Sequence, residues 1–583
     1  MHVVATAGHV DHGKSTLIRA LTGMEPDRWA QERRRGMTID LGFAWTRLPS
    51  QRQVAFVDVP GHERFLANML AGVGAVPAVM FVVAADEGWM PQSAEHLAAL
   101  DALGVRHGLL VVTRCDLADA GRALAQARSE LAGTTLGGIE AVTVSGTTGE
   151  GMDGLRRALD RLVGGLPAPD DDADARLWID RAFTIRGAGT VVTGTLGAGT
   201  LRVGDSLTLA PAMRPVVIRG LQCLGEPVAE VTGVSRVAVN LRGLPVDEVA
   251  RGHALLTPGR WLTTDEIDVR LTGILANDLP ASGQLHVGSA QLPVRVRPLG
   301  ADTARLALSG PLPLRIGDRA LLRDPGLHRI AAGVTILDVR PPALRRRGAA
   351  AVRARELAGQ DGRPDGAAEL RRRLVMRSAQ LVAMGATPPA PPIVDDWLIE
   401  PSHLSALRRQ LRALVSEHAA DRPLEAGLPI EAARRRLGLP DARLVAALVA
   451  APLALLDGRV CQGGPSLPAP VARAVAALQD ELGADPYAAP APARLAELSL
   501  GRRELAAVVR AGALARVAED VYLLPESLAD VDRRLAALPQ PFTVSEAREA
   551  LRTSRRVAVP LLELLDAQGR TQRLPDNRRR LSP

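Results

Sequence analysis

The sequence predicts a multidomain chain: an α/β phosphate-loop domain, then two β-barrel domains, then a C-terminal region of tandem winged helices with an α+β fold. Three observations lead to this prediction. A glycine-rich stretch joins an apolar segment to a helical pattern near the N-terminus, and short alternating segments fill the middle of the chain. A helix–turn–helix–hairpin pattern then recurs after about residue 370. The length of 583 residues agrees with about four domains.

The composition excludes some classes of protein. Hydrophobic residues make up 47% of the chain and aromatic residues 2%, so the cores are built from Ala, Leu and Val. Because there is no apolar run of about 18 residues, we expect no membrane partner. We also expect no signal peptide, since the first strand starts at once. The cysteines Cys115, Cys223 and Cys461 are far apart, which favours a reducing, cytoplasmic location without disulfides. The net charge of +7 is compatible with a nucleic-acid partner.

The stretch "GHVDHGKST" contains the single lysine of the chain, because the other 70 of its 71 Lys and Arg residues are arginine. Gly8, Gly13, Lys14 and Ser15 satisfy the phosphate-loop pattern G-x-x-x-x-G-K-[ST], and the apolar strand at 3–7 precedes them. The glycines let backbone N–H groups converge on phosphate oxygens. Lys14 then places a compact ammonium between the β- and γ-phosphates, where the planar fork of arginine fits poorly.

Further motifs in the expected order complete a phosphate-loop GTPase domain. The strand predicted at 53–59 delivers Asp58 and Gly61 in a D-x-x-G arrangement. In such GTPases the Asp holds Mg²⁺ through water, and the Gly amide senses the γ-phosphate. Thr38, in "RRRGMTIDLG", offers a hydroxyl and a carbonyl that can close over Mg²⁺ and the γ-phosphate. The predicted Mg²⁺ residues are Ser15, Thr38 and Asp58.

Guanine selectivity is expected from a later strand end. Asp116 follows the apolar strand at 109–112, and its carboxylate can accept N1–H and N2–H₂ of guanine. The usual N-K-x-D pattern is replaced here by Thr113-Arg114-Cys115-Asp116, and the stem of Arg114 can still cover a purine face. This departure leaves the affinity for guanine open. The expected GTP-binding residues are Gly8, Asp11, His12, Gly13, Lys14, Ser15, Thr16, Asp58, Gly61, Thr113, Arg114, Asp116, Ser145 and Gly146.

"DVPGH" and "AADEGWMPQSAEHL" resemble one branch of GTPases, the translation factors. The resemblance implies that His62, directly after the D-x-x-G glycine, is the catalytic residue that orients the attacking water. It also implies that Val10 and Met37 form an apolar gate that keeps His62 from water until the ribosome triggers closure. His62 acts by positioning and electrostatics, since little covalent chemistry falls to the protein in phosphoryl transfer.

The middle of the chain alternates apolar and polar residues and is rich in Val, Thr and Gly, which predicts β-barrels. It resembles the second domain of translational GTPases in "GAGTVVTGT" and "LRVGD". Asp180, Arg181 and Arg236 match the positions that form the amino-acid pocket of bacterial selenocysteine-specific elongation factors. A selenol is ionised at neutral pH whereas serine on the same tRNA is neutral, so a cationic pocket favours selenocysteine. The alternative is that both arginines are surface charges on barrel strands.

An Arg/Gly/Pro-rich linker precedes a helical remainder of about 200 residues. Its recurring pattern predicts tandem winged helices, of which we expect four, with the first poorly resolved in the sequence. Residues 541–583 contain nine Arg against five Asp and Glu. The resemblance to the selenocysteine factors implies that the last modules bind the mRNA hairpin after the UGA codon, whereas the alternative is a surface for protein contacts. The expected RNA-binding residues are Arg555 and Arg556 at a helix start and Arg570 and Arg573 at the wing.

The predicted domains are a GTPase domain at 1–168, barrels at 169–260 and 261–342, and the linker with the winged-helix region at 343–583. The resemblance implies a monomeric GTP- and Mg²⁺-dependent factor that delivers selenocysteinyl-tRNA to the ribosome. One alternative is a general translational GTPase that carries aminoacyl- or initiator-tRNA. Another is the GTPase subunit of ATP sulfurylase, which predicts a partner enzyme and no RNA affinity. A third is a nucleic-acid-binding regulator with a decayed GTPase.

Overall fold

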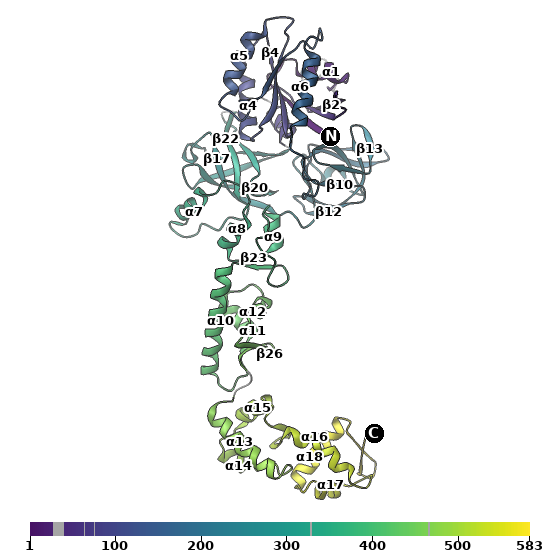
Figure 1. Ribbon diagram of the computed structural model, residues 1–583, viewed down its shortest axis with the longest axis vertical. Helices are drawn as coiled ribbons and strands as arrows, with labels where there is room; N and C mark the ends of the chain where they lie inside the picture. The colour runs from purple at the N-terminus through teal and green to yellow at the C-terminus, as the bar shows by residue number, and fades with distance from the viewer. Residues whose placement is uncertain (27–39, 63–64, 75, 327–328, 464–466, 583) are drawn as a thin grey trace. The chain divides into compact units, whose positions relative to one another are not determined.

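The structure is a computed structural model, and it describes residues 1–582 except 27–39, 63–64, 75, 327–328 and 464–466. The chain forms two compact units (Figure 1). The first contains Met1–Glu369 and Arg377–Pro389, and the second contains Leu370–Met376 and Ala390–Pro583. Among the described residues, no helix is both long enough and apolar enough to cross a membrane.

The first unit starts with an α/β domain whose described strands form one sheet in the order β2-β3-β1-β4-β5-β6. Strand β2 is antiparallel to β3, and the other neighbours are parallel. The strands are β1 (His2–Ala7), β2 (Gly42–Arg47), β3 (Gln53–Asp58), β4 (Ala78–Ala84), β5 (His107–Thr113) and β6 (Glu140–Thr143). The helices are α1 (Lys14–Thr22), α3 (Leu66–Val73), α4 (Pro91–Ala102), α5 (Ala120–Leu131) and α6 (Met152–Gly164).

Side chains of the parallel strands alternate between two apolar cores because successive strand residues point to opposite faces of the sheet. Val4, Phe56 and Met80 lie with α1 and α6 in one core. Val3 and Phe81 lie with α3, α4 and α5 in the other. Helices therefore cover both faces of the sheet, as Figure 1 shows. The carboxyl ends of β1, β3 and β5 are left to carry loops at one edge, where ligands bind in open α/β sheets.

The next strands close into a first barrel. The ring runs β11-β16-β7-β9-β15-β12, and β12 pairs with β11 to complete it. Strand β8 pairs with β9 outside this path. The bounds are β7 (Arg176–Trp178), β8 (Arg181–Ile185), β9 (Gly189–Leu196), β10 (Thr200–Arg202), β11 (Ser206–Ala210), β12 (Arg214–Cys223), β13 (Glu226–Val228), β14 (Glu230–Thr232), β15 (Ser235–Leu241) and β16 (Ala254–Leu256).

A second barrel is closed in the order β17-β20-β19-β18-β21-β22, so the predicted pair of barrels is confirmed. Its interior is filled by alternate residues of each strand, such as Ile267, Val269 and Leu271 on β17, all of which are buried. The bounds are β17 (Thr263–Thr272), β18 (Ser282–Val287), β19 (Ala290–Pro298), β20 (Thr303–Pro313), β21 (Arg319–Asp324) and β22 (Arg329–Asp338).

Arginines stacked on a tryptophan join the two barrels. The guanidinium carbons of Arg176 and Arg315 lie 4.6 Å and 3.7 Å from the ring centroid of Trp261. Arg176 also binds Asp318 through two hydrogen bonds of 2.6 and 2.7 Å, and Arg315 binds Asp174 at 2.7 Å. Because these partners come from both barrels, the contacts hold the barrels together.

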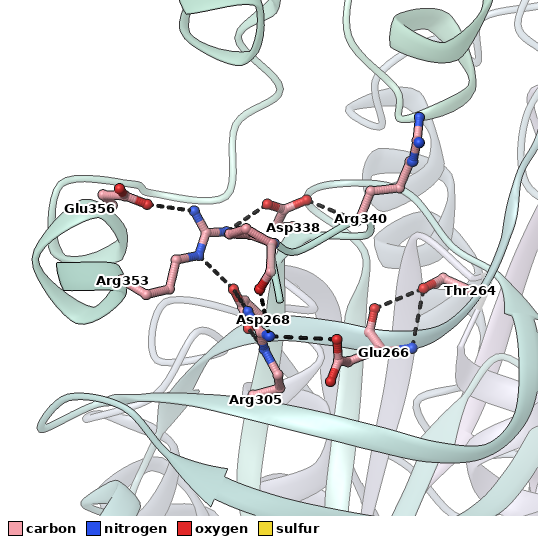
Figure 2. Close-up of polar contacts among 9 residues, drawn as sticks. Thr264, Glu266, Asp268, Arg305, Asp338, Arg340, Arg353 and Glu356 are labelled. Carbon is pink, nitrogen blue, oxygen red and sulfur yellow. Dashed lines mark hydrogen bonds and ion pairs between the residues drawn. The ribbon is translucent and has the colours of Figure 1, made fainter. Parts of the chain in front are cut away.

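A buried ionic network fastens the helix after the second barrel, α7 (Ala349–Ala358), to that barrel (Figure 2). Arg353 of α7 donates to Asp268 at 2.7 Å and to Asp338 at 2.5 Å. Arg305 donates to both carboxylate oxygens of Asp268, at 2.7 and 3.0 Å. Both carboxylates are buried, with 0% and 1% of their side chains exposed. Two guanidinium groups thus neutralise two carboxylates, and α7 is held by charge rather than by apolar packing alone.

The second unit repeats one arrangement along the described residues: helices followed by a two-stranded wing. The first copy contains α10 (Pro401–Asp421), α11 (Ile430–Leu437), α12 (Ala442–Leu448), β25 (Leu428–Pro429), β26 (Leu453–Leu456) and β27 (Arg459–Gln462). The second contains α13 (Ala469–Ala484), α14 (Pro492–Glu497), α15 (Arg502–Arg510), β28 (Ala515–Ala518) and β29 (Val521–Leu523). The third contains α16 (Pro525–Ala536), α17 (Val544–Ala550), α18 (Arg555–Ala567), β30 (Thr571–Arg573) and β31 (Arg579–Leu581).

These copies confirm the predicted winged helices. The earlier stretch predicted to hold another copy forms the short elements α8 (Gly366–Arg373), β23 (Val375–Arg377), α9 (Ser378–Ala383) and β24 (Trp397–Ile399). Local sequence explains the helix starts: proline at the first position begins α10, α14 and α16, and Thr543 with Glu546 forms a capping box on α17. The second and third copies share one continuous core that includes Tyr487, Val508 and Phe542.

We expect Arg353→Met to destabilise the first unit by about 3–5 kcal/mol, because it leaves a buried carboxylate without its partner. The measurement is urea-induced unfolding of the full chain. The matched control is Arg363→Met, since the side chain of Arg363 is 90% exposed and its loss should change the free energy of unfolding little. Equal unfolding midpoints for the two variants would contradict the role of the network.

Candidate functional site

The phosphate loop connects β1 to α1 and requires glycine at two places. Gly8 has φ of 127°, and a Cβ there would lie 2.1 Å from the carbonyl oxygen of Val82. Gly13 has φ of 77° and caps the N-terminus of α1. The first N–H groups of a helix have no partner within the helix, so a helix start that follows such a loop suits an anion. The loop therefore has the two glycine conformations that the predicted phosphate loop requires.

Lys14 lies inside this cradle with 6% of its surface exposed. Its Nζ donates to the carbonyl oxygens of Gly8 at 3.0 Å and His9 at 2.6 Å. Burial lowers the pKa of Lys14 to about 8. The backbone of Gly61 is packed against the same group, because a Cβ on Gly61 would lie 2.6 Å from Nζ and 2.5 Å from the N atom of Val10. The loop of the D-x-x-G motif can therefore approach the phosphate loop this closely only because Gly61 has no side chain.

Asp58 and Ser15 are brought together at the end of β3. Ser15 donates to one carboxylate oxygen of Asp58 at 2.7 Å, and Thr6 donates to the other at 2.7 Å. Burial raises the pKa of Asp58, and the hydrogen bond from Ser15 opposes this shift. A hydroxyl beside a carboxylate is a set of oxygen donors that suits Mg²⁺ when phosphates and water complete the shell. The third predicted ligand, Thr38, lies outside the described residues.

The loops predicted to contact guanine lie at the ends of β5 and β6. Thr113 donates to the carbonyl oxygen of His12 at 2.8 Å, which ties the first loop to the phosphate loop. Ser145 is buried, and its Oγ accepts from the N–H groups of Thr147 and Thr148 at 3.3 and 3.1 Å. Ser145 therefore holds the backbone of the second loop through these bonds, whereas Asp116 and Gly146 line the cavity.

Arg114 has acidic partners that the sequence motifs did not indicate. Its Nη1 binds Asp86 at 3.0 Å and Glu87 at 2.8 Å, and Nη2 binds the carbonyl oxygen of Asp11. The guanidinium head thus joins the phosphate loop to the end of β4, while the side chain also lines the cavity. The adjacent acids in "AADEG" were the available signal, but their partner is set by the fold and not by the spacing.

One cavity of the α/β domain gathers most predicted GTP-binding residues. The lining includes Asp11, Gly13, Lys14, Ser15, Thr16, Gly61, Thr113, Arg114, Asp116 and Gly146. Four predicted residues are not part of this lining: Gly8, His12, Asp58 and Ser145. The last three are fully buried. The motifs did not identify Leu17, Leu117 and Thr147, which also line the cavity.

His62 directly follows Gly61, which lines this cavity, but His62 is not itself among the lining residues. It is half-buried, and its ring centroid is 6.0 Å from that of Phe65. The N–H of Phe65 donates to the carbonyl oxygen of His62 at 2.9 Å. Of the predicted apolar gate, Val10 lines the cavity and Met37 lies outside the described residues.

A second site lies where the first barrel contacts the α/β domain. Strands β8 and β15 flank β9 and carry Arg181 and Arg236. Both arginines line one cavity with Phe43 and Trp45 of β2 and with Phe183. The cavity therefore has aromatic walls and carries two guanidinium groups, while Asp180, the third residue of the predicted pocket, is not among its lining residues.

Both arginines of this pocket have carboxylate partners. Arg236 binds both oxygens of Asp180, one of them at 2.8 Å, and its guanidinium carbon lies 4.0 Å from the ring centroid of Phe43. Arg181 binds Asp40, which precedes β2. Asp40 is a pocket neighbour that the sequence motifs did not identify, because a surface carboxylate gives no pattern of its own. The positive charge of the two arginines is thus compensated by two carboxylates.

The predicted RNA-binding arginines fall into two groups. Arg555 begins α18 and Arg573 ends β30, and both are exposed. Arg556 is exposed as well, but it donates to the backbone carbonyl oxygens of Asp520, Ala489 and Pro490. Arg570 is half-buried and binds Asp532 at 2.6 Å. The last two therefore hold the module together as well, and the charge available to a ligand is smaller than the count of arginines suggested.

Known proteins resemble both ends of the chain. Residues 1–164 match the elongation factor Tu GTP binding domain, and residues 533–580 match a winged helix of elongation factor SelB. Elongation factor Tu 2 of Streptomyces avermitilis is 33% identical over 46% of this chain and 75% of its own length. The selenocysteine-specific elongation factor of Desulfomicrobium baculatum is 37% identical over 58% of this chain and 55% of its own length.

The fold has a full-length counterpart among solved structures. A bacterial selenocysteine-specific elongation factor covers 100% of both chains with a TM-score of 0.77 and 24% identity. The chain belongs to the elongation factor Tu family of translational GTPases. Within that family its similarity is to the selenocysteine-specific elongation factors, and the chain spans about half the length of the curated relatives it matches under that name.

We expect Lys14→Arg to weaken GTP binding by about 10- to 100-fold, because the buried space around Nζ does not admit a planar guanidinium. The measurement is the dissociation constant of a fluorescent GTP analogue. The matched control is Arg19→Lys on the same helix, since the side chain of Arg19 is 56% exposed and should not matter. An unchanged dissociation constant for Lys14→Arg would refute the assigned role.

Proposed function

We propose that this protein is a GTP-dependent elongation factor that binds selenocysteinyl-tRNA and delivers it to the ribosome at a recoded UGA codon. In this proposal the C-terminal winged helices bind an mRNA hairpin after that codon. The observation that carries the proposal is the cavity lined by Arg181 and Arg236 beside aromatic walls. A general aminoacyl-tRNA carrier has no need for two guanidinium groups in its amino-acid pocket.

The nucleotide site binds GTP in this proposal, with Lys14 and the loop N–H groups on the phosphates and Asp116 on guanine. Ser15 and Asp58 hold Mg²⁺, and Thr38 joins them. The ion, when bound, screens the charge of the phosphate oxygens. Thr113 and Arg114 position the phosphate loop through their bonds to His12 and Asp11. GTP binding holds the arrangement that accepts tRNA, and hydrolysis releases it.

His62 orients the water that attacks the γ-phosphate. Its place directly after Gly61 supports this role, since Gly61 is packed against Lys14 and Val10. The residue contributes through position and electrostatics, because the transferred phosphoryl group needs little covalent help from the protein.

Selenocysteine is selected by charge in the barrel pocket. A selenolate is an anion at neutral pH, and the side chain of serine on the same tRNA is neutral. The walls of Phe43, Trp45 and Phe183 exclude water around Arg236, whose side chain is 12% exposed. In such a partly dry site an ion pair is stronger than in water, so the difference in affinity between the two amino acids is amplified.

The third winged helix supplies an RNA surface through Arg555 and Arg573, with support from Arg556 and Arg570. A hairpin held there raises the local concentration of the factor near the codon, as any tether does. The protein acts as a monomer at cytoplasmic ribosomes in this proposal. The contacts are with phosphates and with an unstacked loop base, which is how RNA hairpins are commonly bound.

The deciding test compares protection of the aminoacyl ester from hydrolysis for selenocysteinyl- and seryl-tRNA of the same body, with a non-hydrolysable GTP analogue. We expect protection of the first and little of the second. Arg236→Met should reduce the preference about tenfold, since it removes one charge-assisted contact. Arg202→Met on the same barrel, 60% exposed, is the control. Equal protection of both tRNAs would favour a general carrier, and protection of neither would favour a GTPase subunit of a metabolic enzyme.

Arg555→Ala and Arg573→Ala should each weaken binding of a hairpin taken from the host's selenoprotein mRNA. Each lost phosphate contact should also reduce the slope of log affinity against log salt by about 1. The measurement is fluorescence anisotropy at several salt concentrations. Arg502→Ala serves as control because that side chain, in the second copy, is 89% exposed. Equal losses of RNA affinity in all three variants would show that the RNA responds to the overall charge and not to a surface formed by Arg555 and Arg573.

A further inference from the structure

Asp40 binds one of the two pocket arginines, and the function proposed above makes no use of it. It lies directly before Leu41 and β2 in the α/β domain, and Arg181 begins β8 of the first barrel. The two side chains form an ion pair in which 31% of Asp40 and 23% of Arg181 are exposed. The pair therefore joins two domains at a residue that lines the cavity.

The other pocket arginine is held differently. Arg236 takes its carboxylate from Asp180 of the same barrel through two bonds, and Asp180 also accepts from Thr193 at 2.8 Å. Only 6% of the Asp180 side chain is exposed. Asp180 is thus fixed from several sides and belongs to the built frame of the pocket. Asp40 contacts Arg181 through one oxygen, and its other oxygen accepts from the N–H of Leu41 at 2.9 Å.

The local charge shows what Asp40 does. Arg251 lies close enough that Asp40 and Asp180 oppose the lowering of its pKa by burial. These five side chains contain three guanidinium groups and two carboxylates, which leaves one net positive charge. Without Asp40 the same group has two. A carboxylate and a selenolate carry the same single charge, so both compete for the same guanidinium.

We infer that Asp40 competes with the selenolate for Arg181, lowers the affinity of the pocket for selenocysteine and is displaced when selenocysteine enters the pocket. This inference rests on the proposed function. An ionised amino-acid side chain repays the broken ion pair by taking over Arg181. A neutral serine side chain cannot do so, and Asp40 then stays where it is. The competing carboxylate therefore lowers affinity for selenocysteinyl-tRNA, leaves affinity for seryl-tRNA unchanged, and holds selenocysteine binding below the level that the two arginines allow.

The displacement also connects the pocket to the GTPase domain. Because Asp40 belongs to the α/β domain and Arg181 to the barrel, selenocysteine releases one contact between them. Linkage is reciprocal: an event that separates Asp40 from Arg181 raises affinity for selenocysteine by the same factor by which bound selenocysteine favours that event.

The test is Asp40→Asn, which keeps the shape of the side chain and removes its charge. Using the full chain with a non-hydrolysable GTP analogue, we expect affinity for selenocysteinyl-tRNA to rise about fivefold, the upper range for an ion pair that water reaches. Affinity for seryl-tRNA of the same body should stay unchanged. The control is Asp265→Asn on β17, an exposed carboxylate elsewhere in the same unit. Thermal unfolding and GTP affinity of both variants show that the fold is kept.

A double-mutant cycle with Arg181→Ala distinguishes competition from a general change of charge. If Asp40 acts through Arg181, Asp40→Asn has no effect on selenocysteinyl-tRNA affinity in the Arg181→Ala background. A fall in affinity with Asp40→Asn alone would overturn the inference, since it would mean that Asp40 orients Arg181 for its ligand. A wild-type protein that does not distinguish the two tRNAs would overturn the proposed function itself, whatever Asp40→Asn does.

Discussion

Pairing of guanidinium groups with carboxylates is the interaction on which the joints of the first unit depend. Arg176 with Asp318 and Arg315 with Asp174 link the barrels, and Arg353 with Asp268 holds α7. Arg181 with Asp40 links the first barrel to the α/β domain. A guanidinium forms two parallel hydrogen bonds in one plane, so it fixes direction as well as distance. Of these joints, the pair of Arg176 and Asp318 has this two-bond geometry, and the other three pairs are each made through one hydrogen bond.

Lys14 is the exception to this use of arginine. Lys14 lies where several backbone carbonyl oxygens and Gly61 crowd one nitrogen atom, and a point charge with rotatable donors fits that space. Arginine satisfies the joints because they present planar carboxylates, and it fails in the phosphate cradle because phosphates need a compact cation between them. The distribution of the two residue types thus follows the shape of the anion that each must meet.

Charge compensation gives the pocket its character. Neutralised guanidinium groups are cheaper to hold in an apolar cavity than bare ones, because desolvating an unpaired charge is costly. The frame of Asp180, Thr193 and Phe43 keeps Arg236 in one orientation. Arg181 is paired with Asp40 of the α/β domain. A ligand can therefore bind Arg181 only if this contact between the two domains is broken. A pocket with one fixed and one exchangeable pair can distinguish an anion from a neutral group of similar size.

The sequence by itself determined the phosphate loop, the alternation of the barrels and the recurrence of winged helices. These depend on local spacing: glycine where φ is positive, alternate apolar residues on strands, and proline or Thr–Glu caps at helix starts. Only the tertiary structure decided which ion pairs form. These are Arg114 with Asp86 and Glu87, Arg570 with Asp532, and Arg181 with Asp40. These partners are far apart in the chain, and in a protein with 70 arginines and 64 acidic residues, composition leaves the pairing open. Folding selects the pairs because it brings particular guanidinium and carboxylate groups within hydrogen-bond distance.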